Sequence, residues 1–262
     1  MKTRILTLIL FAFCIVYSYS NVVVINGLTH VYSGSSGETI KGEVILLNSS
    51  EDEQRVTFDL SEAIFSCTSD RIFSKDNSHD QSSTNWFEGN LMERILAPKE
   101  KYVYRFNIAI PNNEELKGSF WSMLMVNIEK PIRKETKGNI GIDTKVRYAI
   151  GLLTNVNSYE EINLEFEDIN LKEDINTAKK ELEVKILNES LFVEGTRLSL
   201  EVYNKDGVKV HEAVTGRNMV FPGFCKNYKI DISELKKGEY ECVLLADSRE
   251  EFFGTNISLT IK

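Results

Sequence analysis

The stretch that decides the fold is Tyr102-Val-Tyr-Arg-Phe-Asn-Ile-Ala-Ile-Pro111. Aromatic and branched apolar residues occupy every second position from Tyr102 to Ile110, and the residues between them are mixed. A period of two places alternate side chains on opposite faces of a β-strand, so this stretch predicts a strand with one face on a core and the other in water. Pro111 ends the strand because proline has no N–H to donate to a sheet.

The same alternation recurs along the rest of the chain, whereas helical periodicity is almost absent. Further segments that carry it are Val56–Leu60, Val146–Leu152, Leu182–Ile186 and Leu198–Val202. After the last of these, Asn204-Lys-Asp-Gly207 predicts a hairpin turn, since Asp-Gly tolerates the positive φ that such turns need. Many short strands joined by turns are typical of β-sandwiches. The polar stretch 171–182 has no apolar stripe and is predicted to be a loop.

Two parts of the sequence look alike and set the number of domains. In the first, an alternating strand from Tyr104 leads to Leu116-Lys-Gly-Ser-Phe120 and an apolar strand. In the second, an alternating strand from Tyr228 leads to Leu235-Lys-Lys-Gly-Glu-Tyr240 and another apolar strand. The spacing of the two copies is close to the length of one immunoglobulin-like sandwich, about 100 residues. We therefore predict an all-β protein of two tandem immunoglobulin-like β-sandwich domains, at residues 21–157 and 158–262.

Residues 1–20 are predicted to be a cleaved signal peptide rather than part of the fold. Lys2 and Arg4 form a positive start, Ile5–Val16 is an apolar run, and small residues flank Tyr19 before the predicted cleavage site. The apolar run is too short for a transmembrane helix, which needs about 20 residues, and no other segment is long enough to span a membrane. We predict export to the periplasm, the cell surface or the medium; a retained N-terminal anchor is the alternative.

Removal of this segment leaves Cys67, Cys225 and Cys242. An odd number leaves at least one thiol free or paired with another molecule, so we do not expect disulfides to carry this fold. Tyr240 and Cys242 have the spacing of the tyrosine corner of immunoglobulin-like folds, but the strand that would hold a partner cysteine, Leu182–Leu187, has none. Cys242 is therefore predicted to be a buried free thiol, while a bridge between Cys225 and Cys242 stays open.

Longer motifs resemble known exported proteins. The first copy contains Gly37-Glu-Thr-Ile-Lys-Gly-Glu-Val, Asn85-Trp-Phe, Leu96-Ala-Pro-Lys-Glu and Gly118-Ser-Phe-Trp-Ser, and the second contains Tyr203-Asn-Lys-Asp-Gly and Phe221-Pro-Gly. Over nearly all of the mature chain, this layout is similar to bacterial exported two-domain proteins of the WxL-interacting type and, more distantly, to PapD-type periplasmic pilus chaperones. The resemblance implies two domains outside the cytoplasm that bind a protein or a cell-wall polymer without catalysis. The chain departs from these families because no basic anchor pair can be placed in it and no membrane helix follows Ile257–Ile261.

The charge and the scarcity of histidine exclude several classes of function. With 31 basic and 39 acidic side chains the formal net charge is -8, which argues against a nucleic-acid-binding protein. The sequence has 3 histidines, and no Cys-x-x-Cys or His-x-x-x-His pair offers a metal site. His79 lies in a polar loop, Ser74–Thr84, where we expect surface exposure rather than a catalytic base. We predict no enzyme activity, no metal and no cofactor; a hydrolase of unrecognised type is the remaining enzymatic alternative.

The predicted function is binding through the first sandwich. Val146, Tyr148, Ile150 and Leu152 alternate on what would be its closing strand, and an exposed sheet edge can pair with a strand of a partner. Trp86 ends a polar loop, where an aromatic side chain can anchor a partner. We predict a chaperone-like or surface-assembly module that binds another envelope or surface protein at these residues. The alternative is a cell-wall or surface carbohydrate-binding protein in which Trp86 stacks on sugar.

Overall fold

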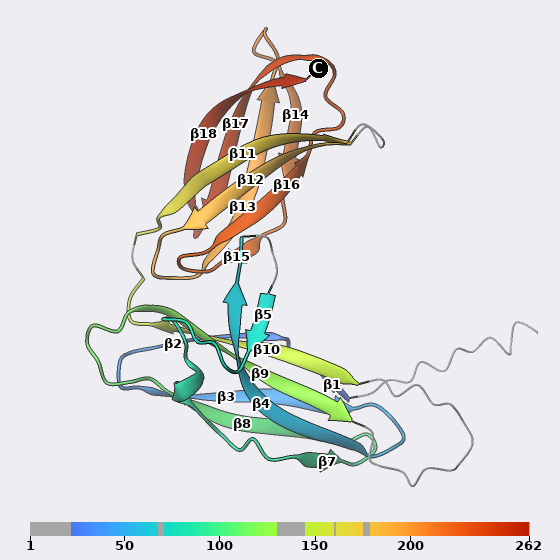
Figure 1. The fold of residues 1–262 in the computed structure, drawn as a ribbon, viewed down its shortest axis with the longest axis vertical. Helices are drawn as coiled ribbons and strands as arrows, with labels where there is room; N and C mark the ends of the chain where they lie inside the picture. The colour runs from blue at the N-terminus through green and yellow to red at the C-terminus, as the bar shows by residue number, and fades with distance from the viewer. Residues whose placement is uncertain (1–21, 68–70, 130–144, 160, 175–178, 262) are drawn as a thin grey trace, which may run out of the picture.

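The computed structural model describes residues 22–67, 71–129, 145–159, 161–174 and 179–261. In these ranges the chain forms two immunoglobulin-like sandwiches of β-strands, seen one above the other in Figure 1, which confirms the predicted fold class. The predicted signal at residues 1–20 lies outside the described residues. In the described part, no helix is long and apolar enough to cross a membrane.

The first sandwich is built from the strands that precede residue 157. One sheet has the order β1 (Val22–Val24), β3 (Thr39–Asn48), β8 (Lys101–Ala109), β6 (Phe87–Gly89). The facing sheet has the order β2 (Thr29–Gly34), β10 (Val146–Val156), β9 (Gly118–Glu129), β4 (Gln54–Phe65), β5 (Arg71–Ser74), with β7 (Arg94–Leu96) also paired to β4. A short 3-10 helix, η1 (Thr84–Trp86), lies between β5 and β6 in the chain. The consecutive strands β1 and β2 therefore belong to opposite sheets.

Alternation explains the core of the first sandwich. β8 matches the strand predicted from Tyr102 to Ile110, and its inward side chains are buried. The Tyr104 ring stacks on Phe58 of β4 with ring centroids 4.2 Å apart, so aromatic contacts join the two sheets. β9 differs because both of its faces are buried: Leu124 faces this core, whereas Trp121 on the other face belongs to a separate apolar cluster. Val193, Phe221 and Phe224 of the other sandwich pack against that second face.

The second sandwich is built from the strands that follow residue 163. One sheet has the order β11 (Leu164–Asp174), β12 (Lys179–Asn188), β16 (Cys225–Asp231). The other has the order β14 (Lys209–Val214), β13 (Glu194–Tyr203), β17 (Gly238–Ser248), β18 (Glu251–Ile261), with β15 (Asn218–Val220) also paired to β13. The hairpin predicted at Asn204–Gly207 joins β13 to β14, and Gly207 has a φ of 74°, in the region that favours glycine.

Strand pairing confirms the internal repeat. β3 pairs with β8 as β12 pairs with β16, and β9 lies between β4 and β10 as β17 lies between β13 and β18. The tyrosine corner is present in the second copy, where the Tyr240 O–H donates to the Lys236 carbonyl at 2.9 Å. Asn48 and Asn188 form a repeated feature that was not predicted: each ends its strand, is fully buried, and donates its side-chain N–H groups to a loop carbonyl and to the last carbonyl of a short strand, β7 or β15. The predicted domain boundary after residue 157 stays a prediction.

One segment of the second sandwich contradicts the sequence prediction. The stretch 171–182, predicted to be a loop, contains the end of β11 and the start of β12. The pairing of these strands shifts register between Phe166 and Asp168, and this bulge interrupts the period-two pattern that would reveal β11. β11 is also an edge strand with exposed carboxylates such as Glu165, a composition common at sheet edges.

Candidate functional site

β10 has a backbone edge that is only half covered. It pairs with β9 over its whole length but with β2 only from Gly151 onward, where the Gly151 N–H donates to the Leu28 carbonyl at 2.9 Å. Within the described residues, Val146–Ile150 has no strand partner on that second side, and we call this segment the free edge. Successive N–H groups of a strand point to opposite sides, so Arg147 and Ala149, like Gly151, direct theirs to the uncovered side. The free edge therefore offers donors and acceptors to an incoming strand.

The predicted binding residues occupy two environments on this strand. Ile150 and Leu152 are buried in the core of the first sandwich. Val146 and Tyr148 are half-buried, and the Tyr148 O–H donates to the Val22 carbonyl of β1 at 3.1 Å. Because β1 is the edge of the opposite sheet, both sheets end on this side of the sandwich. We call β1 together with the free edge the open flank.

Trp86 lies in the core rather than on the surface. It is 8% exposed, and its ring packs on Phe120 of β9 with ring centroids 4.7 Å apart. η1 turns the end of the polar loop inward, so the aromatic residue at that end points to the core. This position offers no stacking surface to a ligand, and we assign Trp86 no role in binding.

A cavity of about 340 Å³ lies between the two sandwiches, next to the free edge. Its wall includes Ala149 of β10, Phe65 at the end of β4 and Met219 of β15, and we call it the interdomain cavity. The charged residues among those that line it are both arginines, Arg71 of β5 and Arg217. The cavity thus combines an apolar wall with two cations contributed by different sandwiches.

Arg217 is held in place by its neighbours. Its Nη1 donates to the Gly195 carbonyl, and its Nη2 donates to Asp247 at 2.8 Å. Arg197 donates to the same Asp247 oxygen at 2.7 Å, so two guanidinium groups share one carboxylate. Burial alone would raise the pKa of Asp247, but the hydrogen bonds and charges of Arg217 and Arg197 outweigh it and lower that pKa. These hydrogen bonds fix the guanidinium of Arg217 at the wall of the cavity.

A disulfide between Cys67 and Cys225 joins the two sandwiches, which contradicts the expectation that disulfides do not carry this fold. The two residues are 158 positions apart in the sequence, and their Cα atoms are 4.7 Å apart. No local spacing motif pairs them, because each belongs to a different half of the chain. Cys242 is a buried free thiol, as predicted, and burial raises its pKa to about 11.

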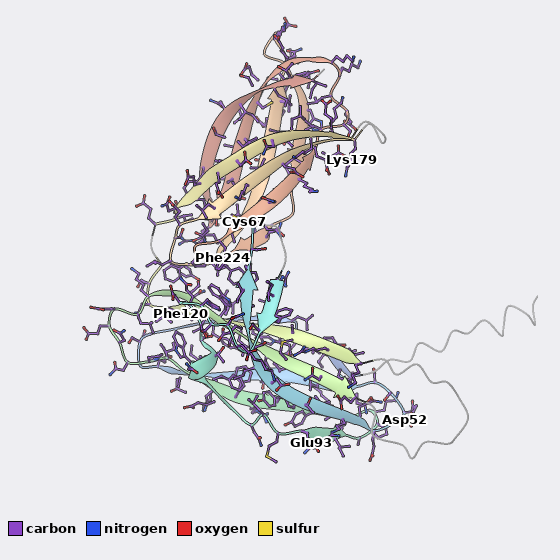
Figure 2. All side chains as sticks on the ribbon, viewed as in Figure 1. Asp52, Cys67, Glu93, Phe120, Lys179 and Phe224 are labelled. Carbon is purple, nitrogen blue, oxygen red and sulfur yellow. A yellow bond between two sulfur atoms is a disulfide. The ribbon has the colours of Figure 1, made fainter. Side chains whose placement is uncertain are left out.

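Aromatic side chains pack across the junction beside this disulfide. Phe65 stacks on Phe221 with ring centroids 3.8 Å apart, and Trp121 of β9 meets Phe221 edge-on at 4.7 Å. The Phe224 ring lies 6.2 Å from Phe65. We call Phe65, Trp121, Phe221 and Phe224 the interdomain aromatic cluster. Figure 2 labels Cys67 and Phe224 where the two sandwiches meet.

His79 lies against this cluster and not on the surface, where the sequence predicts it. Its ring stacks on Trp121 with centroids 4.4 Å apart, and its Nε2 lies 3.3 Å from Glu62 Oε2. The side chains of His79 and Glu62 are each 9% exposed. Ser82 donates its hydroxyl to Glu62 at 2.7 Å rather than to His79, so this hydroxyl is not placed for activation by the imidazole.

We expect His79 to make the stability of the protein depend on pH. Burial lowers the pKa of His79, against the opposing charges of Glu62 and Asp80, while an unfolded histidine titrates near about 6.5. Below that pH the unfolded chain takes up the proton more readily, so stability is complete above about 6.5 and declines as pH falls toward the folded pKa. Urea midpoints measured from about pH 7.5 to about 5.5 should fall more for the unmodified protein than for His79→Gln. Equal pH slopes for the two proteins would contradict this assignment.

The sequence matches no protein-family model and no curated protein. Among solved structures, the chain is similar to the class 5 fimbriae chaperone CfaA, with a TM-score of 0.50 and 12% identity, covering 90% of this chain and 98% of that one. It also matches a chaperone–tip adhesin complex of CFA/I fimbriae biogenesis (TM-score 0.48, 12% identity, 91% and 98% covered) and the E. coli chaperone DraB (TM-score 0.43, 14% identity, 91% and 98% covered). At this identity the likeness to CfaA shows a shared fold. The fold that the resemblance to pilus chaperones implies is thus confirmed. The resemblance to proteins of the WxL-interacting type stays a prediction.

Proposed function

We propose that this protein is a non-enzymatic, exported binding protein, chaperone-like or acting in surface assembly, that holds a strand of another envelope protein. The observation that carries this proposal is the free edge of β10, which leads directly to the interdomain cavity. A partner strand paired with Val146–Ile150 extends the sheet through backbone hydrogen bonds. The fold that the chain shares with a fimbrial chaperone supports the same conclusion.

The open flank gives the partner's apolar side chains a place to be buried. Val146 and Tyr148 are half-buried at the margin of the core, and β1 borders them from the opposite sheet. Every second side chain of an added strand points to one face, so an alternating apolar strand would place its apolar row over this margin. Each Å² of apolar surface removed from water contributes about 25 cal/mol.

The two arginines suit an acidic group on the partner. β10 passes from the free edge into the cavity wall at Ala149 and Gly151, so a strand added along this edge would reach Arg71 and Arg217. Guanidinium groups bind carboxylates through charge-assisted hydrogen bonds that are often paired. We therefore propose that an acidic side chain or a chain-terminal carboxylate of the partner enters the interdomain cavity.

Neither alternative function has an observation in its favour. Because Trp86 is buried, the stacking platform that would favour a carbohydrate ligand is missing at that residue. A hydrolase would need a histidine beside a nucleophile, and the His79 ring is instead held between Trp121 and Glu62.

We expect Arg147→Pro to weaken capture of the partner by about tenfold or more while the sandwich stays folded. Proline removes the Arg147 N–H, which points to the free edge, and leaves intact the N–H groups that bond to β9. Arg147→Ala is the matched control, because it removes the same side chain and keeps the N–H. Capture is measured by crosslinking in an envelope fraction, and thermal unfolding checks that both variants are folded. Equal capture by the two variants would contradict pairing at this edge.

Mild crosslinking in the envelope of cells that produce the protein, followed by mass spectrometry, tests the function itself. We expect a covalent complex with a secreted or surface protein, with crosslinks that map to β1 and β10. Recovery of the free protein alone would count against the proposal. Crosslinks confined to polysaccharide would favour the carbohydrate alternative instead.

A further inference from the structure

The two sandwiches are covalently joined at two separate places. The main chain passes from β10 to β11 at residues 157–163, and the disulfide joins Cys67 to Cys225. Cys67 lies in the turn between β4 and β5, a hairpin that reaches toward the second sandwich in Figure 2. A single linker permits rotation of one sandwich against the other, whereas a second covalent connection removes that freedom.

The side of the junction near the linker has compact contacts of its own. The Ser119 N–H donates to the Leu191 carbonyl at 2.8 Å, and the Val193 N–H donates to Ser119 Oγ at 2.8 Å. Gly118 makes this approach possible, because it has a φ of 118° and a Cβ there would lie 2.5 Å from the Leu191 oxygen. Because these contacts are confined to a few residues beside the linker, one sandwich can rotate about them relative to the other. The interdomain aromatic cluster adjoins these contacts at Val193, which packs against it, and extends from there to the disulfide beside Phe65 and Phe224.

The disulfide is placed for exchange with an external thiol. Cys67 is half-buried and Cys225 is 5% exposed, so Cys67 is the more accessible of the two residues. A small cavity beside Cys225 is lined by Arg71 and Lys226. Positive side chains stabilise the thiolate that leaves when a disulfide opens.

We propose that the Cys67–Cys225 disulfide is a redox switch that fixes the angle between the sandwiches and thereby shapes the interdomain cavity. A thiolate of a dithiol reductant attacks Cys67 Sγ and forms a mixed disulfide; the protein bond breaks, and its electron pair leaves on Cys225, which takes up a proton. The second thiol of the reductant then attacks the mixed disulfide, releasing Cys67 as a thiol and the reductant as its own disulfide. The protein gains two electrons and two protons, and the dithiol loses them.

Arg71 couples this switch to the binding site. It lines both the interdomain cavity and the small cavity beside Cys225. When the disulfide is open, the hairpin that carries Arg71 is free to move away from the sandwich that carries Arg217, so the two arginines no longer face one anionic group. The consequence for the partner rests on the proposed function, whereas the change of angle does not.

Small-angle X-ray scattering of the full mature chain tests the change of angle, with dithiothreitol as the dithiol. The oxidised protein should scatter as one rigid particle, and the reduced protein should have a larger radius of gyration and a broader distance distribution. The Cys67→Ser/Cys225→Ser double variant should match the reduced protein with or without dithiothreitol. The control Cys242→Ser removes a buried thiol in the core of the second sandwich, and it should respond as the unmodified protein does.

Tryptophan fluorescence gives a second, local readout. The chain has 2 tryptophans, so Trp86→Phe leaves Trp121 of the interdomain aromatic cluster as the only one. In the oxidised protein this ring is 2% exposed, which shields it from acrylamide. Reduction should raise the acrylamide quenching constant several-fold, because the cluster separates.

The outcomes separate the switch from the proposed function. Unchanged scattering and unchanged quenching after reduction, with thiol titration proving that the disulfide is open, would overturn the switch. Changes in both, together with loss of the crosslinked partner in the double variant, would support the switch and its effect on binding. If scattering and quenching both change on reduction but the oxidised protein captures no partner, the redox switch is supported and the proposed function is rejected. If the oxidised protein and the double variant capture the partner equally, only the proposed effect of the disulfide on partner binding is overturned.

Discussion

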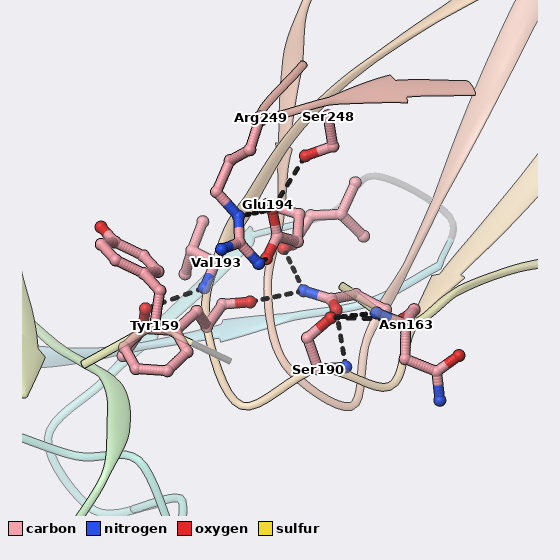
Figure 3. A network of polar contacts seen from close by, with 12 residues as sticks. Tyr159, Asn163, Ser190, Val193, Glu194, Ser248 and Arg249 are labelled. Atoms are coloured by element: carbon pink, nitrogen blue, oxygen red, sulfur yellow. Dashed lines mark hydrogen bonds and ion pairs between the residues drawn. The ribbon is translucent and has the colours of Figure 1, made fainter. Parts of the chain in front are cut away.

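Replacing Arg249 by methionine is expected to lower the free energy of unfolding by about 3–5 kcal/mol, because it leaves a carboxylate buried without its cation. The carboxylate belongs to Glu194, whose side chain is 1% exposed at the start of β13. Arg249 donates to it twice, from Nη2 at 2.7 Å and from Nε at 3.0 Å, and Ser248 donates its hydroxyl at 2.8 Å. Figure 3 shows these groups converging on Glu194.

The large effect follows from where the charge lies and not from the strength of one ion pair. A carboxylate removed from water has lost its hydration, and among the described residues the guanidinium of Arg249 and the hydroxyl of Ser248 replace that hydration. Arg249 itself reaches the surface, and its guanidinium carbon lies 5.0 Å from the centroid of the Tyr159 ring, which adds a favourable contact for the cation. Methionine keeps much of the apolar stem of arginine and removes the donors, so the change isolates the polar part.

Two further variants show whether the buried charge of Glu194 causes the loss, when the free energy of unfolding of each is measured in urea. Arg249→Met/Glu194→Gln should recover most of the lost stability, because glutamine is neutral and still accepts the hydrogen bond of Ser248. Arg197→Met is the matched surface control, since Arg197 is 49% exposed and Asp247 keeps Arg217 after its loss; its cost should stay below about 1 kcal/mol. If Arg249→Met costs no more than Arg197→Met, the burial of Glu194 does not control stability.

Much of the fold could be predicted from sequence because its signals are local. The alternation from Tyr102 to Ile110 specifies β8 without knowledge of any other strand, and the spacing of Tyr240 and Cys242 identifies a corner whose hydrogen bond the structure contains. The prediction was wrong where a local irregularity masked the pattern. The bulge after Phe166 moves β11 out of phase, so period-two counting does not find that strand.

Less of the candidate site could be predicted, because its decisive features are pairings between distant segments. The alternation of β10 is visible in the sequence, but nothing local tells that β2 pairs with its second half and that, among the described residues, Val146–Ile150 has no strand partner on that side. The Cys67–Cys225 bond depends on how the two sandwiches meet, which no spacing rule encodes. Trp86 shows a related limit, since an aromatic residue at the end of a polar loop has the same sequence signature whether it points inward or outward.

Trp121→Ala is the second change for which we expect a loss of about 3–5 kcal/mol in the free energy of unfolding, the usual cost of truncating a buried tryptophan. The indole is 2% exposed and lies on the face of β9 that the second sandwich covers. Its Nε1–H donates to the Ala63 carbonyl at 2.8 Å, so truncation also leaves a buried acceptor without its donor.

Urea unfolding of the oxidised Trp121→Phe protein separates the loss of the hydrogen bond to Ala63 from the loss of ring packing. Phenylalanine keeps a ring against Phe221 and His79 but lacks the N–H, so it should lose about 1–3 kcal/mol. Trp121→Ala should in addition weaken the pH dependence assigned to His79, because that ring loses the stack that shields it from water and its pKa moves back toward its ordinary value. A Trp121→Ala protein with unchanged stability and an unchanged pH slope would contradict both the stabilisation assigned to the aromatic junction and the shielding of His79.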